Sequence, residues 1–132
     1  MNTYTLHDIA APVERHALGR WGEAAVATWC VARGWEVLAA GVRARDSELD
    51  LVIRDGDRIA FCEVRTRRTT TGPTALESIG PRKQQRVRRG AERWMGELQS
   101  MPEAWHFHFD VYALEPGPMG QGWVLIRVED AF

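Results

Sequence analysis

Residues 47–68 read SELDLVIRDGDRIAFCEVRTRR and carry the clearest structural pattern in the chain. Two runs rich in β-branched and aromatic residues flank the dipeptide Asp55-Gly56, which is typical of a two-residue hairpin turn. Antiparallel pairing across this turn would bring Asp50 close to Glu63. The sequence therefore predicts a half-buried pair of strands that carries neighbouring carboxylates.

Two carboxylates this close repel each other, so either one takes up a proton or a cation neutralises them. A hard divalent cation is one solution, because Mg²⁺ or Mn²⁺ uses few protein carboxylates and completes its shell with water and substrate phosphate. The other solution is an ion pair with Arg43, Arg45 or Arg65. Both solutions stay open at the level of the sequence.

Outward from the hairpin, the apolar periodicity and the turn residues predict an α/β protein in which helices flank a mixed sheet. The predicted helices span 18–35 and 81–100, and the predicted strands span 35–43, 48–55, 58–65, 105–114 and 123–132. The buried faces of the helices are expected to contain Leu18, Gly22, Ala25, Trp29 and Ala32, and Val87, Ala91, Trp94, Met95 and Leu98, respectively. Residues 1–14 are expected to form a loose tail and residues 15–132 a single domain.

The composition indicates a globular protein with a substantial core. The chain has 132 residues, of which 45% are hydrophobic and six are tryptophan. No run approaches the roughly 18 apolar residues of a membrane span, and the N-terminus lacks the pattern of a signal peptide. Cys30 and Cys62 are expected to be reduced, buried thiols. These observations predict a cytoplasmic protein that has no contact with membranes.

The charge is unevenly distributed along the chain. The formal net charge is −1, yet residues 65–93 contain nine basic side chains and only Glu77 and Glu92 as acids. A cationic segment on a nearly neutral protein indicates a local anion-binding face. A solvated helix face is the alternative, and the charge pattern alone does not distinguish the two.

Several segments, in order, resemble the YraN-like family of small bacterial proteins. They are GRWGEAA in the first predicted helix, residues 47–67, the basic helix, HFDVYAL and VEDAF, and together they extend over roughly residues 16–132. That family is assigned to the restriction-endonuclease-like superfamily, which carries the PD-(D/E)XK nuclease motif. The resemblance implies an αβββαβ core and an arrangement similar to that of archaeal Holliday-junction resolvases.

The resemblance also implies roles for individual residues. Glu23 matches the acid of the first helix, Asp50 the motif aspartate and Glu63 the acid of the E-x-K element. Arg65 occupies the position of the motif lysine and completes the implied catalytic set. The implied ligands of Mg²⁺ or Mn²⁺ are Asp50, Glu63 and the carbonyl of Val64. Water activated by the metal would attack phosphorus in line, and the 3′ oxygen would leave.

The arginine at the lysine position changes the expected chemistry. A lysine begins with a pKa of about 10.4, whereas an arginine above about 12.5 is neutral in fewer than roughly one molecule in 10⁵ at pH 7. Arg65 therefore cannot act as a general base, although it can stabilise negative charge on the phosphorane. Lys83 is the only lysine in the chain. We hypothesise that its titratable amine reaches the site in place of Arg65, the alternative being a solvated helix residue.

The implied substrate is DNA, branched or flapped, whose cleavage would suit a homodimer. The residues expected to contact its phosphates are Arg67, Arg68, Arg82, Lys83, Arg86 and Arg89. Such contacts give salt-sensitive binding with little sequence preference, because backbone charge carries no base information.

Three other interpretations remain. A catalytically silent nucleic-acid-binding module of the same fold is favoured by Arg65, and an adaptor that docks the basic helix on an acidic protein would fit the small net charge. His106 and His108 have the spacing of a zinc ligand pair on one strand face, but no further N or S ligand is evident. Asp110 lies on the same face, and the position that it matches in the YraN-like family favours a structural role.

Overall fold

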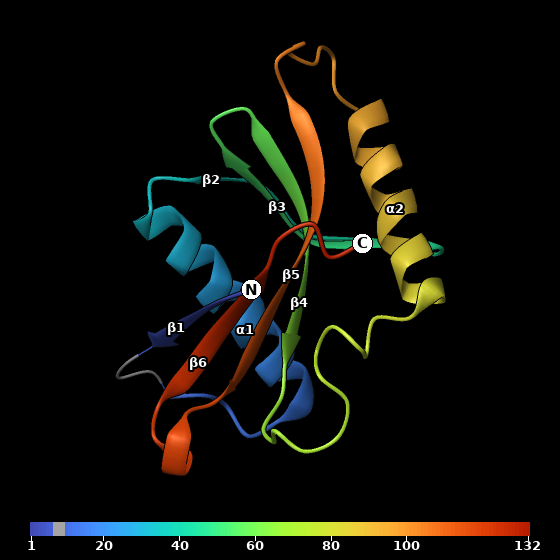
Figure 1. Cartoon of the computed structure of the whole chain (residues 1–132). Helices are drawn as coiled ribbons and strands as arrows, with labels where there is room; N and C mark the ends of the chain where they lie inside the picture. Colours follow the sequence, from blue (N-terminus) through green and yellow to red (C-terminus); the bar gives the residue numbers. More distant parts are fainter. Residues whose placement is uncertain (7–9) are drawn as a thin grey trace.

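The structure is a computed structural model, and it describes residues 1–6 and 10–132. Six strands form one mixed sheet in the order β1-β6-β5-β4-β3-β2, with α1 on one face and α2 on the other (Figure 1). The elements are β1 Asn2–Leu6, α1 Arg15–Ala32, β2 Glu36–Ala44, β3 Ser47–Asp55, β4 Arg58–Thr66, α2 Pro81–Gly96, β5 His106–Pro116, the short 3-10 helix η1 Pro118–Gly120 and β6 Trp123–Val128. The pair β4–β5 is parallel and the other pairs are antiparallel. The predicted mixed α/β architecture is confirmed.

The predicted hairpin joins β3 to β4 at Asp55-Gly56. Gly56 has a φ of 60°, a left-handed conformation that glycine adopts without steric cost. The antiparallel ladder begins where Asp55 faces Arg58 and continues to the pair Leu51 and Cys62. This ladder fixes the register in which the acids of the two strands approach each other.

Two hydrophobic layers hold the helices against the sheet, because alternate side chains of each strand point to opposite faces. On the α1 side the buried residues include Val26, Cys30, Leu51, Cys62, Tyr112 and Leu114. On the α2 side they are Leu49, Val52, Ile59, Phe61, Val87 and Ala91. The two predicted thiols, Cys30 and Cys62, are free and buried, as expected.

Two glycines allow the helices to approach the strands closely. A Cβ atom on Gly22 of α1 would overlap the hydroxyl of Thr66, and one on Gly90 of α2 would lie 2.7 Å from the carbonyl oxygen of Glu48. The close contacts bring the backbones of both helices onto the strands that carry the acids. They therefore fix the position of Glu23, the residue that follows Gly22.

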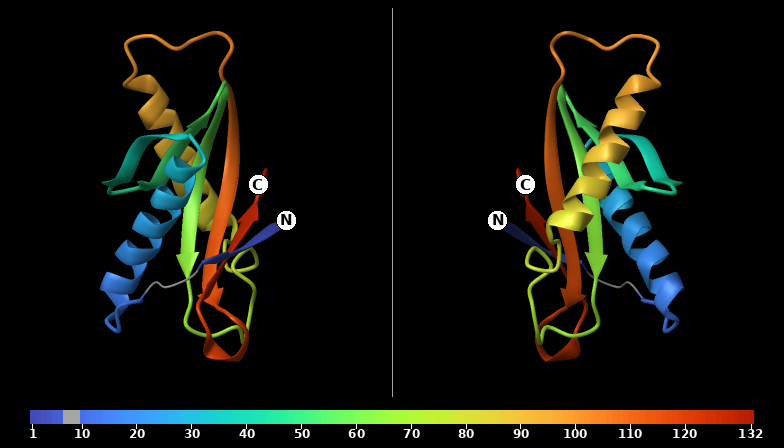
Figure 2. Two further views of the ribbon diagram at one scale, coloured as in Figure 1. Left: turned by 90° about the vertical axis from the view of Figure 1, so that its left-hand side faces the viewer. Right: turned by 90° about the vertical axis from the view of Figure 1, so that its right-hand side faces the viewer.

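Figure 2 shows the loop after α2 at one end of the sheet and the loops after β4 and β5 at the other. Both helices begin toward the end at which β4 finishes (Figure 1). Residues from the first turns of α1 and α2 therefore flank the end of β4 from opposite faces. Neither helix in the described parts of the chain combines the length and the apolar character needed to cross a membrane.

The expectation of a loose tail over residues 1–14 is wrong for Asn2–Leu6, which form β1. This strand pairs with the outer edge of β6, from Asn2 opposite Arg127 to Leu6 opposite Trp123. Its backbone thereby covers amide and carbonyl groups that β6 would otherwise leave unpaired. The part of the predicted tail at 7–9 lies outside the described residues.

The expected buried face of α1 is correct only at its start. Leu18 and Gly22 are buried, but the row continues through Val26 and Cys30. Trp29 is half-buried, and Ala32, which was expected in the core, is exposed. The row of residues four apart faces the sheet, so the wide ring of Trp29 lies at the rim of the layer, where it packs 4.8 Å from the ring of Tyr4 in β1.

Candidate active site

The structure brings Glu23, Asp50 and Glu63 together where β3 and β4 separate; we call these three residues the acid cluster. The last paired residues of the two strands are Leu51 and Cys62. One residue further on, the Asp50 side chain accepts the backbone N–H of Val64 at 2.8 Å. Asp50 and Glu63 are only 4% and 2% exposed. The carboxylates therefore lie within the opening between the two strands.

Arg43 of β2 neutralises one side of the acid cluster. Its Nη2 atom lies 2.9 Å from Glu23 Oε1 and 3.0 Å from Asp50 Oδ1. Burial and the charge of Asp50 raise the pKa of Glu23, and the hydrogen bond from Arg43 offsets part of this increase. Of the three arginines considered from the sequence, Arg43 is the one that pairs with Asp50.

Glu63 is the most strongly perturbed acid of the cluster. Burial, followed by the charge of Asp50, raises the pKa of Glu63 to about 8. Lys83 and Arg65 lower it only in part, with Nζ and Nε at 3.2 and 3.5 Å from Glu63 Oε1. The other oxygen, Oε2, is buried and has no hydrogen-bond partner among the described residues. Glu63 therefore keeps its proton to a higher pH than an exposed glutamate does.

Lys83 reaches the acid cluster from the first turn of α2, as hypothesised from its being the only lysine. Its Nζ also donates to Glu48, which Arg86 approaches at 3.3 Å. Burial raises the pKa of Glu48, but the hydrogen bonds and charges of Lys83 and Arg86 outweigh burial and lower it overall. The contact with Glu63 places a titratable amine beside the most buried acid of the cluster.

The predicted ligands suit a hard divalent cation in their chemistry but not yet in their arrangement. Among residues 1–6 and 10–132, no three His, Cys, Asp or Glu side chains are grouped so that they could hold a metal ion. Glu63 Oε2 has an unused buried oxygen, whereas the Asp50 oxygens contact Arg43 and the Val64 amide. The residue types suit Mg²⁺ or Mn²⁺, but in this arrangement Arg43 and the Val64 amide occupy both Asp50 oxygens.

Most of the predicted phosphate-binding side chains already have partners within the protein. Arg67 pairs with Glu115 at 2.7 Å, and Arg89 donates to the Asp46 carbonyl at 2.8 Å. Arg68 donates to the Pro12 carbonyl, and Lys83 and Arg86 contact Glu48. Arg82 is exposed and has no ion-pair partner among the described residues.

An open pocket of about 850 Å³ beside Glu23 was not expected from the sequence. Its ionisable lining residues are Arg15, His16, Arg20, Glu23 and Arg43, from α1 and β2. We call it the α1 pocket. These residues do not form a basic run in the sequence, because a helix turn and a distant strand bring them together. Only their helical spacing could have indicated the group.

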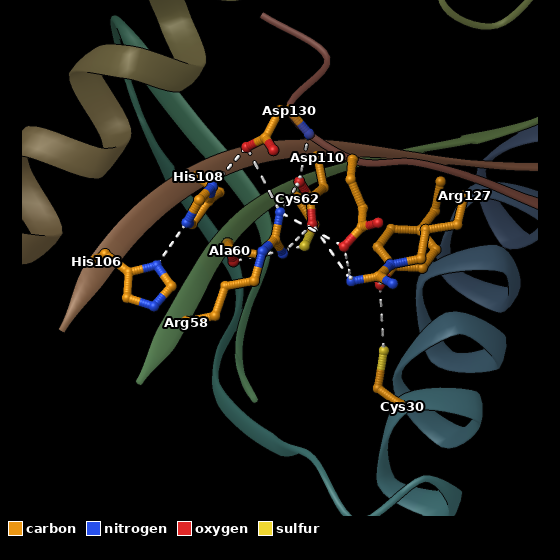
Figure 3. A network of polar contacts seen from close by, with 11 residues as sticks. Cys30, Arg58, Ala60, Cys62, His106, His108, Asp110, Arg127 and Asp130 are labelled. Atoms are coloured by element: carbon orange, nitrogen blue, oxygen red, sulfur yellow. Dashed lines mark hydrogen bonds and ion pairs between the residues drawn. The ribbon is translucent and has the colours of Figure 1, made fainter. Parts of the chain in front are cut away.

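A second ionic network lies on the far side of β4 (Figure 3). Asp110 is fully buried and accepts two hydrogen bonds from Arg58, at 2.6 and 2.9 Å, and one from the Asp130 backbone at 2.9 Å. His106 and His108 contact each other through ring nitrogens 2.6 Å apart, and His108 also contacts Asp130. Asp110 therefore joins β4, β5 and the C-terminal residues rather than extending the histidine pair.

Comparison with known proteins gives the family. The model of the uncharacterised protein family UPF0102 matches residues 22–114, which include the acid cluster and Lys83. A UPF0102 protein of Frankia alni is 40% identical over 115 residues, covering 87% of this chain and 91% of the relative. One of Symbiobacterium thermophilum is 38% identical over 104 residues, covering 79% and 86%. The chain therefore belongs to UPF0102, the family that its YraN-like segments indicate.

Proposed function

We propose that this protein is a Mg²⁺- or Mn²⁺-dependent endonuclease that hydrolyses phosphodiester bonds in DNA, built on a restriction-endonuclease-like αβββαβ core. The observation that carries the proposal is the pair Asp50 and Glu63. Two buried carboxylates from adjacent strands meet at the opening between β3 and β4, and Glu63 retains one oxygen without a partner. Acidic residues whose pKa is strongly shifted by burial and by a nearby charge occur more often at functional sites than elsewhere.

The proposed ligands of the metal are Asp50, Glu63 and the carbonyl of Val64. A bound ion would supply positive charge for the phosphate and lower the pKa of a water molecule. Before Asp50 is available, its contact with Arg43 has to open, and Glu63 has to release its proton. Glu23, which belongs to α1, stays beside Asp50 and keeps its ion pair with the guanidinium of Arg43.

Lys83 and Arg65 have different roles in this proposal. Lys83 Nζ lies 3.2 Å from Glu63 Oε1, so in this proposal it takes the role of the motif lysine. Arg65, 3.5 Å from the same oxygen, stabilises negative charge as it develops on phosphorus.

The partner in this proposal is the DNA backbone, in branched or flapped DNA, with a homodimer as the active form and the cytoplasm as the location. Arg82 of α2 is exposed and forms no ion pair among the described residues, so it is available to phosphate. Phosphate contacts make binding sensitive to salt and largely independent of sequence.

The deciding experiment incubates the protein with linear, nicked, flap and four-way DNA and Mn²⁺, beside Asp50→Asn and Glu63→Gln. Cleavage by the wild type that is lost in both variants supports the proposal. Cleavage that survives in both variants comes from a contaminant or another site, and then the acid cluster is not catalytic.

A catalytically silent DNA-binding module is the second candidate. Two observations favour it: Arg65 stands at the motif lysine, and Arg43 pairs with Asp50 where a metal would bind. Binding that weakens steeply with salt in a gel-shift titration, together with no cleavage of any substrate, would identify this function. Binding to neither single- nor double-stranded DNA would leave the adaptor interpretation.

A further inference from the structure

Two acids of the protein hold four of the basic side chains of α2. Lys83 and Arg86 contact Glu48, and Arg89 and Arg93 contact Asp46. Asp46 lies in the turn between β2 and β3, and Glu48 lies just after it. Most of the basic side chains of this helix are therefore engaged in contacts within the protein.

The α1 pocket contains basic side chains that no acid of the described residues pairs with. Arg15 and Arg20 are exposed and form no ion pair with a carboxylate in the parts of the chain that the structure describes. The only acid among the lining residues is Glu23, and it is already paired with Arg43. Three arginines and His16 thus line a pocket of about 850 Å³ in which Glu23 is the only lining acid. Outside the lining, Glu14 lies near His16 and Arg20, and Asp50 pairs with Arg43.

The geometry of the α1 pocket suits a chain of phosphates. His16, Arg20 and Glu23 recur at helical spacing along one side of α1, and Arg15 lies beside this row at its start. Seven residues of helix span roughly 10 Å, and successive phosphates of one DNA strand are about 3.4 Å apart along the helix axis. The row therefore extends along about three nucleotides, and its last member belongs to the acid cluster.

We propose that the α1 pocket is a phosphate-binding site that holds the DNA backbone beside the acid cluster, on the face of the sheet opposite α2. This inference rests on the proposed DNA substrate. Arg43 connects the two sites, because the same side chain lines the pocket and contacts Asp50 at 3.0 Å. The bound strand runs from the first turns of α1 past the acid cluster toward Lys83 at the start of α2.

The test measures binding of a fluorescein-labelled 20-nucleotide DNA, single- and double-stranded, by anisotropy in EDTA. The double variant Arg15→Gln/Arg20→Gln is compared with Arg33→Gln/Arg54→Gln, which removes two charges at the other end of α1 and near the β3–β4 turn. We expect the pocket variant to bind at least tenfold more weakly, with a slope against log salt that is smaller by about 2. The control is expected to change less than threefold with its slope unchanged.

A second variant, which is expected to bind DNA more tightly, tests whether the weaker binding of the pocket variant results from misfolding. Glu23→Gln removes the only acid of the pocket and should tighten DNA binding two- to fivefold. Equal binding by the pocket variant and the control overturns the inference and leaves the proposed nuclease intact, since α2 would then hold the DNA. If the wild type binds no DNA under these conditions, the proposed substrate fails and the inference fails with it.

Discussion

Glu63 combines two properties that oppose each other in a folded protein: it is 2% exposed, and it carries an ionisable group with an unpartnered oxygen. A buried ionisable group destabilises the folded protein when it is charged. Replacing it by a neutral group therefore normally increases stability. Its presence at the opening between β3 and β4 therefore has an energetic cost, and the size of this cost depends on pH.

Stability should fall as pH rises through the range in which Glu63 keeps its proton only in the folded state. The unfolded carboxyl ionises near its ordinary pKa of 4.5, whereas the folded pKa is about 8, so the folded state binds the extra proton between these values. We expect Glu63→Gln to match the wild type at pH 4.5 and to be more stable by on the order of 3 kcal/mol at pH 8.5. Urea unfolding at several pH values measures this.

The control for that series is Glu36→Gln, whose exposed carboxylate lies 3.6 Å from Arg54. It should leave the pH profile of stability parallel to that of the wild type. A Glu63→Gln profile that is also parallel would show that Glu63 is ionised in the folded protein at neutral pH.

Lys83 is predicted to be needed for cleavage and not for DNA binding. Lys83→Met removes the amine that lies 3.2 Å from Glu63, and general acid–base groups contribute roughly 100-fold or more to rate. Gln85→Met is the control, because Gln85 is exposed on the same helix and carries no charge that could contact phosphate. We expect cleavage to fall about 100-fold in the first variant and less than fivefold in the second. Unchanged cleavage by Lys83→Met would exclude it as the replacement for the motif lysine.

The sequence identified the acid cluster because the hairpin fixes the approach of Asp50 to Glu63, and the family resemblance adds Glu23. It named Arg43 only as one of three arginines, since strand pairing does not show how far a long side chain reaches. The α1 pocket was missed for a related reason. Its cations are isolated in the sequence, whereas the basic run on α2 is conspicuous but largely paired.

At the scale of elements, the position of α2 decides whether Lys83 reaches the acid cluster. Gly90 lies at the closest approach of this helix to β3, next to the Glu48 carbonyl and the Leu49 side chain. The helix carries Lys83 two turns earlier, so a displacement at Gly90 is transmitted to the site.

Gly90→Ala should destabilise the protein although alanine favours helices. The new Cβ would lie 2.7 Å from a backbone oxygen and 2.9 Å from Leu49 Cγ, which requires the helix to move. We expect a loss of roughly 1–3 kcal/mol in urea unfolding. Gly19→Ala is the control, since no atom lies within 4 Å of its new Cβ, and it should gain roughly 0.5–1 kcal/mol. Equal effects of the two substitutions would mean that close packing at Gly90 is unimportant.

Most elements could be predicted because period-two and period-3.6 patterns are strong in the central strands and in both helices. The strand β1 was missed, because NTYTL has little apolar alternation and its pairing depends on β6, more than a hundred residues away. The rotation of α1 was also missed, since Trp29 suggested a buried face centred on it, whereas the observed buried row runs through Val26 and Cys30.

At the scale of the whole molecule, the network around Asp110 joins the centre of the sheet to the end of the chain. Asp110 is fully buried and bound to Arg58 of β4, while the Asp130 amide donates to it and Ala131 donates to the Phe109 carbonyl at 2.7 Å. Phe132 stacks on Phe109 with ring centroids 5.2 Å apart. One buried carboxylate thus orders three parts of the fold.

Asp110→Asn should therefore be among the most destabilising single substitutions. It removes the charge that balances Arg58 in a buried site, and breaking such a pair from one side typically costs about 3–5 kcal/mol. Arg54→Gln, which breaks an exposed pair with Glu36, should cost less than about 1 kcal/mol. Urea unfolding compares the two, and a loss below about 1 kcal/mol for Asp110→Asn would contradict a structural role for the network.

The pairing of β1 with β6 has a consequence for biosynthesis. During translation Asn2–Leu6 are synthesised more than a hundred residues before their partner strand Trp123–Val128. The nascent chain can assemble α1, the β2–β4 meander and α2 before β1 has its partner strand β6, because local pairing is fast and distant pairing is slow. Chaperones and proteases would thus meet an unprotected N-terminal strand during translation that the completed sheet covers.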